Sequence, residues 1–189
     1  KSPLNAPNEP EEVEIEFRMG LPVALNGKRM PPVALIQKLN GVAGLHGIGR
    51  TDMIEDRLVG FKSHEIYEAP AAHTLYAAKR GLEQMTLSRE TLMVREGLCV
   101  AFGRAVYNGQ WFSDLREALD AFFERINQNV TGKVRLRLYK GNATVTARSS
   151  DFSLYQQAEA QGDLDSDAAS GFIRVWSRPL SAEARRKKA

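Results

Sequence analysis

Cysteine is almost absent from this sequence of 189 residues, which contains only Cys99. One cysteine cannot form a disulfide within the chain, and this absence fits a reducing compartment. We expect the thiol to lie buried in a helix, where it acts as a small apolar side chain. The sequence also has no apolar run of membrane-spanning length and no signal-peptide pattern. We therefore predict a cytoplasmic protein without a membrane partner.

Motifs that bind phosphates or metals, or that activate nucleophiles, are missing as well. The sequence has no Walker-type loop and no glycine-rich loop joining a strand to a helix, so no cofactor is predicted on this chain. The glycines within residues 44–49 follow a helical pattern, and a helix C-cap with a turn explains them better. The histidines His46, His64 and His73 are too scattered to predict a metal site. On its own, the chain has no complete catalytic apparatus.

A concentrated excess of one charge sign is also missing. The formal net charge is +3, and much of it comes from the basic cluster Arg185–Lys188 near the end. A nucleic-acid-binding protein would carry a concentrated basic face, and the body of the chain shows none. We interpret the cluster as a solvated terminus and predict no nucleic-acid partner.

The apolar periodicity predicts strands and helices in separate blocks rather than in strict alternation. Expected strands cover 13–17, 21–25, 133–139 and 143–148. Two or three further short strands are expected between 50 and 68, and Met53-Ile54 and Leu58-Val59 are the centres of the first two. A late strand or extended arm is expected at Phe172–Trp176. Expected helices cover 32–43, 71–85, 89–107 and 114–126, the last two capped by Ser88 and Ser113. The pattern predicts an α+β fold with a mainly antiparallel sheet, several packed helices and a C-terminal extended arm.

Local signals refine three of these strands. Asn26-Gly27 is typical of a hairpin turn, and Pro22 is expected to place its strand at the edge of the sheet. Lys133, Arg135 and Arg137 share one face of their strand. They form either an anion site or a solvated charged face, and the sequence leaves both open.

Residues 44–70 combine glycines, acids, bases, two histidines and a tyrosine without a long apolar period. Such a run is costly to bury, and loops or short strands on a rigid scaffold often carry functional sites. If residues 54–55 and 66–67 lie on adjacent strands, the carboxylate of Glu55 and the phenol of Tyr67 meet at one rim. This pair suits a small zwitterion, because the carboxylate pairs with an ammonium group and the hydroxyl bonds a polar head group. A surface acid and a half-buried tyrosine without a ligand would show the same spacing.

Many co-linear motifs over nearly the whole chain resemble the argininosuccinate synthase family. They are Glu14-Ile15-Glu16-Phe17, Gly20-Leu21-Pro22-Val23, Asn40 to Arg50, Asp52 to Arg57, Lys62-Ser63, Ile66 to Pro70, Gly132-Lys133-Val134, Leu138 to Asn142, Ser153-Leu154-Tyr155 and Asp167 to Ile173. The resemblance implies the C-terminal part of that enzyme, its synthetase and multimerisation domain.

For the complete enzyme, the resemblance implies an AMP-forming C–N ligase of arginine biosynthesis and the urea cycle. ATP with Mg²⁺, bound in an N-terminal half that is absent from this sequence, adenylylates the ureido oxygen of citrulline and releases pyrophosphate. The aspartate amine then attacks the activated carbon and AMP leaves. The citrulline-contacting glutamate and tyrosine of the family map to Glu55 and Tyr67. No catalytic residue is implied on this chain, which alone is expected to be inactive.

The resemblance and the missing initiator methionine predict a piece of a longer polypeptide. Residues 1–12 are expected to be a linker from the nucleotide-binding domain, residues 13–171 the synthetase/multimerisation domain, and residues 172–189 a C-terminal oligomerisation arm with a basic tail. The family's homotetramer implies that copies of this chain are its protein partners.

The chain departs from the family pattern beside the expected site. The family's Lys-Ser-Arg-Gly is Lys62-Ser63-His64-Glu65 here, and Ala71-Ala72 stand where the family has glycine. The first exchange removes a positive charge and adds a negative one, and Glu65 cannot easily adopt the positive φ of a glycine. The alternative interpretation is therefore a non-catalytic assembly module of a diverged synthase-like protein.

Overall fold

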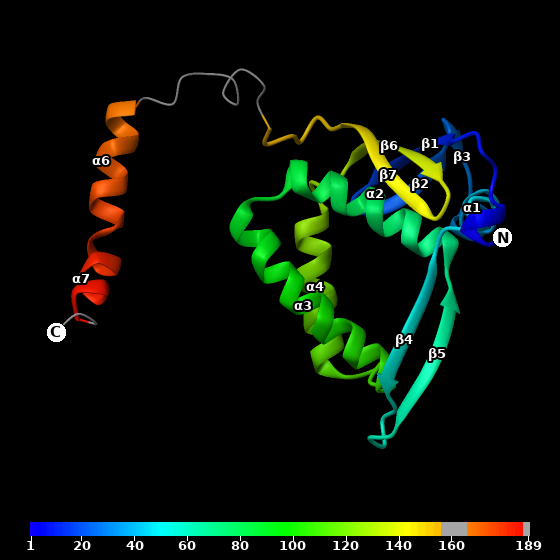
Figure 1. Cartoon of the computed structure of the whole chain (residues 1–189), viewed down its shortest axis with the longest axis horizontal. Helices are drawn as coiled ribbons and strands as arrows, with labels where there is room; N and C mark the ends of the chain where they lie inside the picture. Colours follow the sequence, from blue (N-terminus) through cyan, green and yellow to red (C-terminus); the bar gives the residue numbers. More distant parts are fainter. Residues whose placement is uncertain (156–165, 187–189) are drawn as a thin grey trace. The chain divides into compact units, whose positions relative to one another are not determined.

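The structure is a computed structural model that describes residues 1–155 and 166–186. The chain divides into two units, residues 1–154 and 155–189, and each is described by itself. The elements of the first unit are η1 (Pro3–Asn5), β1 (Glu11–Arg18), β2 (Leu21–Leu25), β3 (Lys28–Arg29), α1 (Pro32–Leu45), β4 (Arg50–Asp56), β5 (Lys62–Glu68), α2 (Pro70–Thr86), α3 (Arg89–Tyr107), α4 (Asp114–Asn127), β6 (Gly132–Tyr139) and β7 (Asn142–Ser149) (Figure 1).

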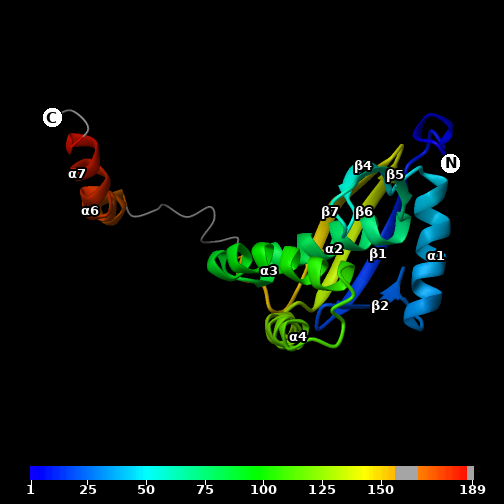
Figure 2. The ribbon, with the colours of Figure 1, turned by 90° about the horizontal axis from the view of Figure 1, so that it is seen from below.

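A five-stranded antiparallel sheet forms the centre of the first unit. Its strand order is β3-β2-β1-β6-β7, so β1 pairs with both β2 and β6. Alternate residues of β1 and β6 face the side on which α1 and α2 pack (Figure 2). The buried core there includes Val13, Ile15, Phe17, Leu35, Leu39, Ala78, Leu82, Val134, Leu136 and Leu138. The predicted α+β fold with a mainly antiparallel sheet is confirmed.

The opposite face of β1 and β6 carries charges that neutralise one another. Arg137 Nε lies 2.9 Å from Glu12 Oε1, and Arg135 Nη2 lies 3.4 Å from Glu14 Oε2. These residues are direct cross-strand partners, and opposite charges in such positions support the pairing of the strands. Arg135 and Arg137 therefore belong to a solvated ladder of ion pairs, which favours the charged-face interpretation over an anion site for these two bases.

Side-chain caps fix the beginnings of two helices. Ser88 Oγ accepts a hydrogen bond from the backbone N–H of Thr91, and Ser113 Oγ accepts one from Arg116. Each bond satisfies a donor that the first helical turn leaves without a backbone partner. Both predicted caps are confirmed, and α3 spans the predicted residues 89–107.

The hairpin predicted at Asn26-Gly27 joins β2 to β3, and both turn residues have positive φ angles of 50° and 73°. The prediction that Pro22 makes β2 an edge strand is wrong, because β3 pairs with β2 at Ala24 and Leu25. Pro22 lies beyond this two-residue pairing, so its missing N–H removes no bond to β3.

Two strands, β4 and β5, form between residues 50 and 68. The prediction of a strand centred on Leu58-Val59 is wrong. These residues lie in the turn between β4 and β5, where the N–H of Arg57 donates to the carbonyl of Phe61 over 2.7 Å. Gly60, with φ of 88°, completes the reversal. The apolar pair is exposed at the tip, because the turn requirement of Gly60 outweighs the β-propensity of its neighbours.

The second unit contains α6 (Ser166–Trp176) and α7 (Arg178–Arg186). The strand or extended arm predicted at Phe172–Trp176 is wrong, since these residues form the end of α6. The rings of Phe172 and Trp176 stack at 5.6 Å, as side chains four positions apart in a helix can. The predicted domain boundary at residue 172 stays a prediction. No helix in residues 1–155 or 166–186 is long and apolar enough to cross a membrane.

Candidate functional site

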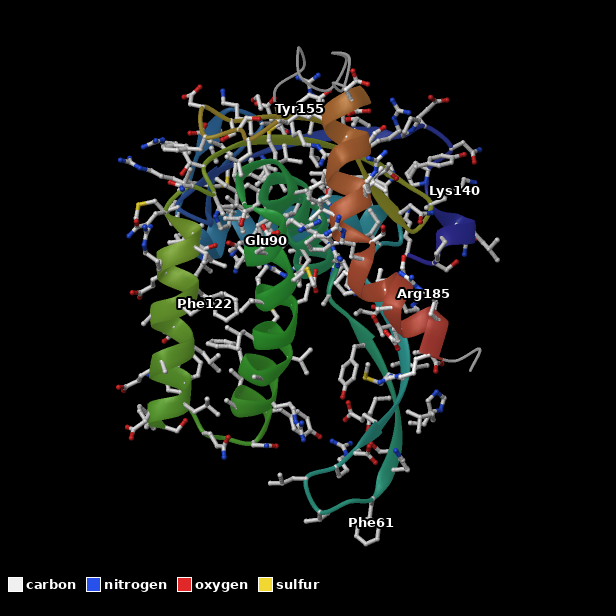
Figure 3. The ribbon with its side chains drawn as sticks, turned by 90° about the vertical axis from the view of Figure 1, so that its left-hand side faces the viewer. Phe61, Glu90, Phe122, Lys140, Tyr155 and Arg185 are labelled. Carbon is white, nitrogen blue, oxygen red and sulfur yellow. The ribbon has the colours of Figure 1, made fainter. Side chains whose placement is uncertain are left out.

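The hairpin of β4 and β5 is a separate two-stranded sheet that projects from the body of the first unit (Figure 1). Figure 3 shows Phe61 at its free end. At its base, the N–H of Ala69 donates to the carbonyl of Gly49 over 2.9 Å. Gly49 has φ of 92°, and an added Cβ would lie 2.6 Å from Pro70. Glycine is therefore required where the hairpin meets α2.

One face of the hairpin is held together by two cross-strand ion pairs and by a polar contact between His64 and Asp52. Their nitrogen–oxygen distances are 2.6, 3.0 and 2.7 Å for Arg50–Glu68, His64–Asp52 and Lys62–Asp56, respectively. All these side chains are exposed, so each pair contributes little free energy by itself. Together they match acids to bases along the two strands, which opposes a shift in register.

The other face brings together the two residues predicted from their spacing. Glu55 lies opposite Ser63, and Tyr67 lies opposite Thr51, four residues further along β5. The Tyr67 phenol spans this offset and donates a hydrogen bond to Glu55 Oε1 over 3.0 Å. The carboxylate and the phenol therefore form one polar pair on one face, while their ligand role stays a prediction.

Arg57 and Glu65 complete this cluster, and neither was predicted. Arg57 forms an ion pair with Glu65, and its Nη1 lies 3.5 Å from Glu55 Oε1. Glu65 occupies an ordinary strand position opposite Met53. Among the described residues, the non-glycine residues with positive φ are Met19, Asn26 and Lys140. Glu65 is not one of them, so the backbone strain expected at this position does not arise. The alternation of residues 63, 65 and 67 could have indicated Glu65.

The electrostatics of the cluster follow from these contacts. The hydrogen bond to Glu55 is the main cause that raises the pKa of Tyr67, and it keeps the phenol protonated. The nearby Glu65 carboxylate raises the pKa of Arg57 most strongly. The Glu55 side chain is 14% exposed, and the hydrogen bond and the ion pair that it forms with described residues both use Oε1. One carboxylate oxygen is thus fixed by the phenol, and the other is available.

The histidines do not join this cluster. His64 pairs with Asp52 on the opposite face, and His73 Nε2 lies 3.2 Å from Thr51 Oγ1. His46 is buried at the end of α1, with Nε2 at 3.4 Å from Glu11. Within residues 1–155 and 166–186, no group of three or more potential ligands could hold a metal ion.

The fold and the site define a class of protein: an α+β domain that presents a polar, ion-paired hairpin outside its core sheet. Comparison with known families then identifies it. Residues 1–183 match the family described as the argininosuccinate synthase C-terminal domain, and the chain belongs to this family.

Individual relatives carry the name argininosuccinate synthase. The protein of Synechococcus elongatus is 51% identical over 183 residues, which cover 95% of this chain and 46% of the relative. The protein of Rubrobacter xylanophilus is 50% identical over 94% of this chain and 44% of its own length. The chloroplastic protein of Arabidopsis thaliana is 46% identical over 98% and 38%. The chain thus spans less than half the length of these relatives.

Proposed function

We propose that this chain is the C-terminal part of an argininosuccinate synthase and that the Glu55–Tyr67 pair binds citrulline. The complete enzyme, a ligase of arginine biosynthesis, would join citrulline to aspartate at the expense of ATP, forming AMP and pyrophosphate. Family membership and the identity to its relatives support the parent activity. The observation that carries the site is the hydrogen bond from Tyr67 to Glu55, which leaves Glu55 Oε2 free among the described residues.

The chemistry of the pair fits the amino-acid end of citrulline. Glu55 Oε2 can accept a charge-assisted hydrogen bond from the ligand's ammonium group. Tyr67 orients the carboxylate by donating to Oε1, and its own oxygen lone pairs remain able to accept an N–H. Arg57 offsets the charge of Glu65, so the exchanged residue does not add an unpaired negative charge beside the ligand.

Aspartate, ATP and its Mg²⁺ would bind in the part of the parent enzyme that lies outside this chain. Among residues 1–155 and 166–186 there is no cluster of metal-ligating side chains, so Mg²⁺ would have to be held by the other part of the parent enzyme. We expect the isolated chain to be inactive and the parent enzyme to be cytoplasmic, although one relative is named chloroplastic. Activity assays and cell fractionation of the parent protein test these two expectations.

Isothermal titration of citrulline into the parent protein tests the site. Glu55→Gln should weaken binding about tenfold or more, because a hydrogen bond to a charged group contributes about 1.5–3 kcal/mol. Tyr67→Phe should weaken it about fivefold, as expected for about 1 kcal/mol from a neutral hydrogen bond. Asp52→Asn is the matched control, since it makes the same kind of change on the opposite face of the hairpin. Equal affinities for wild type and Glu55→Gln would refute the proposal.

A second candidate function is assembly of subunits. The apolar side chains of α6 are exposed, with Phe172, Ile173 and Trp176 each more than 60% accessible. Exposed apolar residues clustered on one short helix favour a protein–protein contact. This role is compatible with citrulline binding, and the family resemblance suggests a homotetramer.

A further inference from the structure

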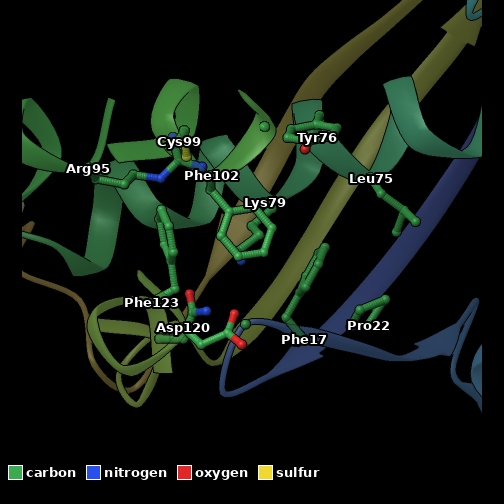
Figure 4. A pocket seen from close by; sticks show the side chains of 13 residues that line it. Phe17, Pro22, Leu75, Tyr76, Lys79, Arg95, Cys99, Phe102, Asp120 and Phe123 are labelled. Atoms are coloured by element: carbon green, nitrogen blue, oxygen red, sulfur yellow. The ribbon is translucent and has the colours of Figure 1, made fainter. Parts of the chain in front are cut away.

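A cavity of about 370 Å³ lies within the first unit, between the sheet and helices α2, α3 and α4. Its lining includes three phenylalanines, two bases and the single cysteine, which are Phe17, Phe102, Phe123, Lys79, Arg95 and Cys99. Figure 4 shows aromatic rings from β1, α3 and α4 around it. Pockets of this volume with mainly apolar walls and a few polar groups are typical of small-molecule sites.

The charges at one wall of this cavity are unbalanced. Glu83 is 1% exposed and forms an ion pair with Arg95 at 3.0 Å. Lys79 Nζ lies farther from the same carboxylate, at 3.8 Å, and its side chain is 26% exposed. Arg95 also lies 4.0 Å from the exposed Glu96, which pairs more closely with Arg80 at 3.0 Å. Three bases thus share two acids, and one positive charge remains in excess. Charges removed from water are stable only when they are paired, so this wall favours an additional anion.

The titration of these groups is consistent with that imbalance. Burial is the main cause that lowers the pKa of Lys79, and the same cause raises the pKa of Glu83. Each shift reflects a charge that is incompletely solvated. An anion beside Lys79 would replace part of the lost solvation.

The remaining polar groups of the lining do not provide this anion. Asp120 already forms an ion pair with Arg116, one turn earlier in α4. Asn127 Oδ1 is buried and has no hydrogen-bond partner, so it can accept from a ligand but carries no charge. In Figure 4, Phe17, Phe102 and Phe123 lie around the space that Lys79 enters. Phe102 and Phe123 make an edge contact at 5.8 Å, which leaves ring faces for stacking.

We propose that this cavity binds a small aromatic carboxylate, with the carboxylate at Lys79 and the ring among the three phenylalanines. The site is separate from the β4–β5 hairpin, and it does not depend on the function proposed above. Phenylacetate is a suitable probe because it combines one ring with one carboxylate. For a ligand of this size we expect a Kd of about 1 mM.

The single cysteine of the chain reports occupancy directly, because Cys99 lines the cavity and is half-buried. The experiment measures alkylation of Cys99 in the 189-residue chain by iodoacetamide, followed by mass spectrometry. At phenylacetate concentrations about ten times Kd, alkylation should slow about tenfold, because only the unliganded fraction reacts. Phenylacetamide, which lacks the charge, and acetate, which lacks the ring, should leave the rate nearly unchanged at the same concentration.

Two variants locate the effect. Lys79→Met should abolish protection by phenylacetate, whereas Lys38→Met, an exposed lysine on α1, should preserve it. Gly103→Leu should also abolish protection, because Gly103 lines the cavity and the open space around an added Cβ leaves room for a side chain that competes with the ligand. The proposal is overturned if phenylacetate does not slow alkylation, if phenylacetamide protects equally well, or if both variants remain protected.

Discussion

Arg57 forms an ion pair with Glu65, the residue that stands where the argininosuccinate synthase pattern has glycine. Arg57 also lies 3.5 Å from Glu55, so one guanidinium faces two carboxylates. The exchange at residue 65 therefore introduces a charge that the hairpin already compensates. This relationship is compatible with the ligand-binding proposal, because Glu65 adds no unpaired charge beside Glu55 and Tyr67.

Titration of the tyrosines tests the hydrogen bond between Tyr67 and Glu55. The pKa of Tyr67 should lie above its ordinary value of 10.0, and Glu55→Gln should lower it more than Glu65→Gln, because the bond to Glu55 is the main cause of the shift. A raised pKa means that the folded state holds the proton more tightly. The associated stability is thus present below the ordinary pKa and is lost as pH rises through the folded one.

The measurement is the near-ultraviolet absorbance of tyrosinate, and the difference between wild type and Tyr67→Phe isolates one phenol. An unshifted Tyr67 curve would contradict the observed hydrogen bond.

Removal of the buried acid should strongly destabilise the first unit. Glu83→Ala leaves Arg95 and Lys79 without their shared carboxylate, and breaking a buried pair typically costs about 3–5 kcal/mol. Lys79→Met removes the excess charge and keeps the close pair, so it should be neutral or stabilising. Urea denaturation measures both variants. Similar losses for the two would show that the charges are balanced without a ligand.

Gly47 is expected to be essential for the packing of the N-terminal segment. Its φ is 71°, and an added Cβ would lie 2.8 Å from the backbone nitrogen of Pro3. Gly47→Ala should cost at least about 1–2 kcal/mol from the left-handed backbone alone. Gly41→Ala is the control, because its added Cβ meets no atom within 4 Å and should stabilise α1 by about 1 kcal/mol. Urea midpoints that shift in the same direction would contradict this prediction.

If α6 mediates assembly, deletion of residues 166–189 should lower the number of chains per particle, which light scattering measures. Trp176→Glu should have the same effect without shortening the chain, since it places a charge on the apolar side of the helix. Arg174→Ala is the matched control on the same helix. If the deletion and Trp176→Glu both leave the number of chains per particle unchanged, this helix is excluded as an oligomer contact.

Local chemistry explains which elements the sequence predicts well. Ser88 and Ser113 bond the first turns of their helices, and Asn26-Gly27 adopts the positive φ angles that its hairpin needs. At Phe172–Trp176, the run of bulky apolar residues suggested a strand, but the one-turn separation of its two aromatic rings suits a helix. The apolar composition of this run therefore led to a strand prediction, whereas the spacing of its aromatic residues has the period of a helix.

The candidate site was predictable only in part. In this hairpin, residues separated by an even number share a face, so Glu55 and Tyr67 are on the same side once the strands are known. Arg57 could not be found in this way, because it lies in the turn beyond β4 and reaches back through a long side chain. The cavity beside Lys79 combines residues from five elements, and no local pattern indicates such a meeting.

The separation of the β4–β5 hairpin from the five-stranded sheet has an evolutionary consequence. Glu55 and Tyr67 hold each other in place from within the hairpin, so exchanges on this surface place few demands on the packed interior. The hairpin surface can therefore change while the scaffold stays intact. Residues 64 and 65, where the chain departs from the family pattern, are held by contacts within the hairpin, His64 with Asp52 and Glu65 with Arg57.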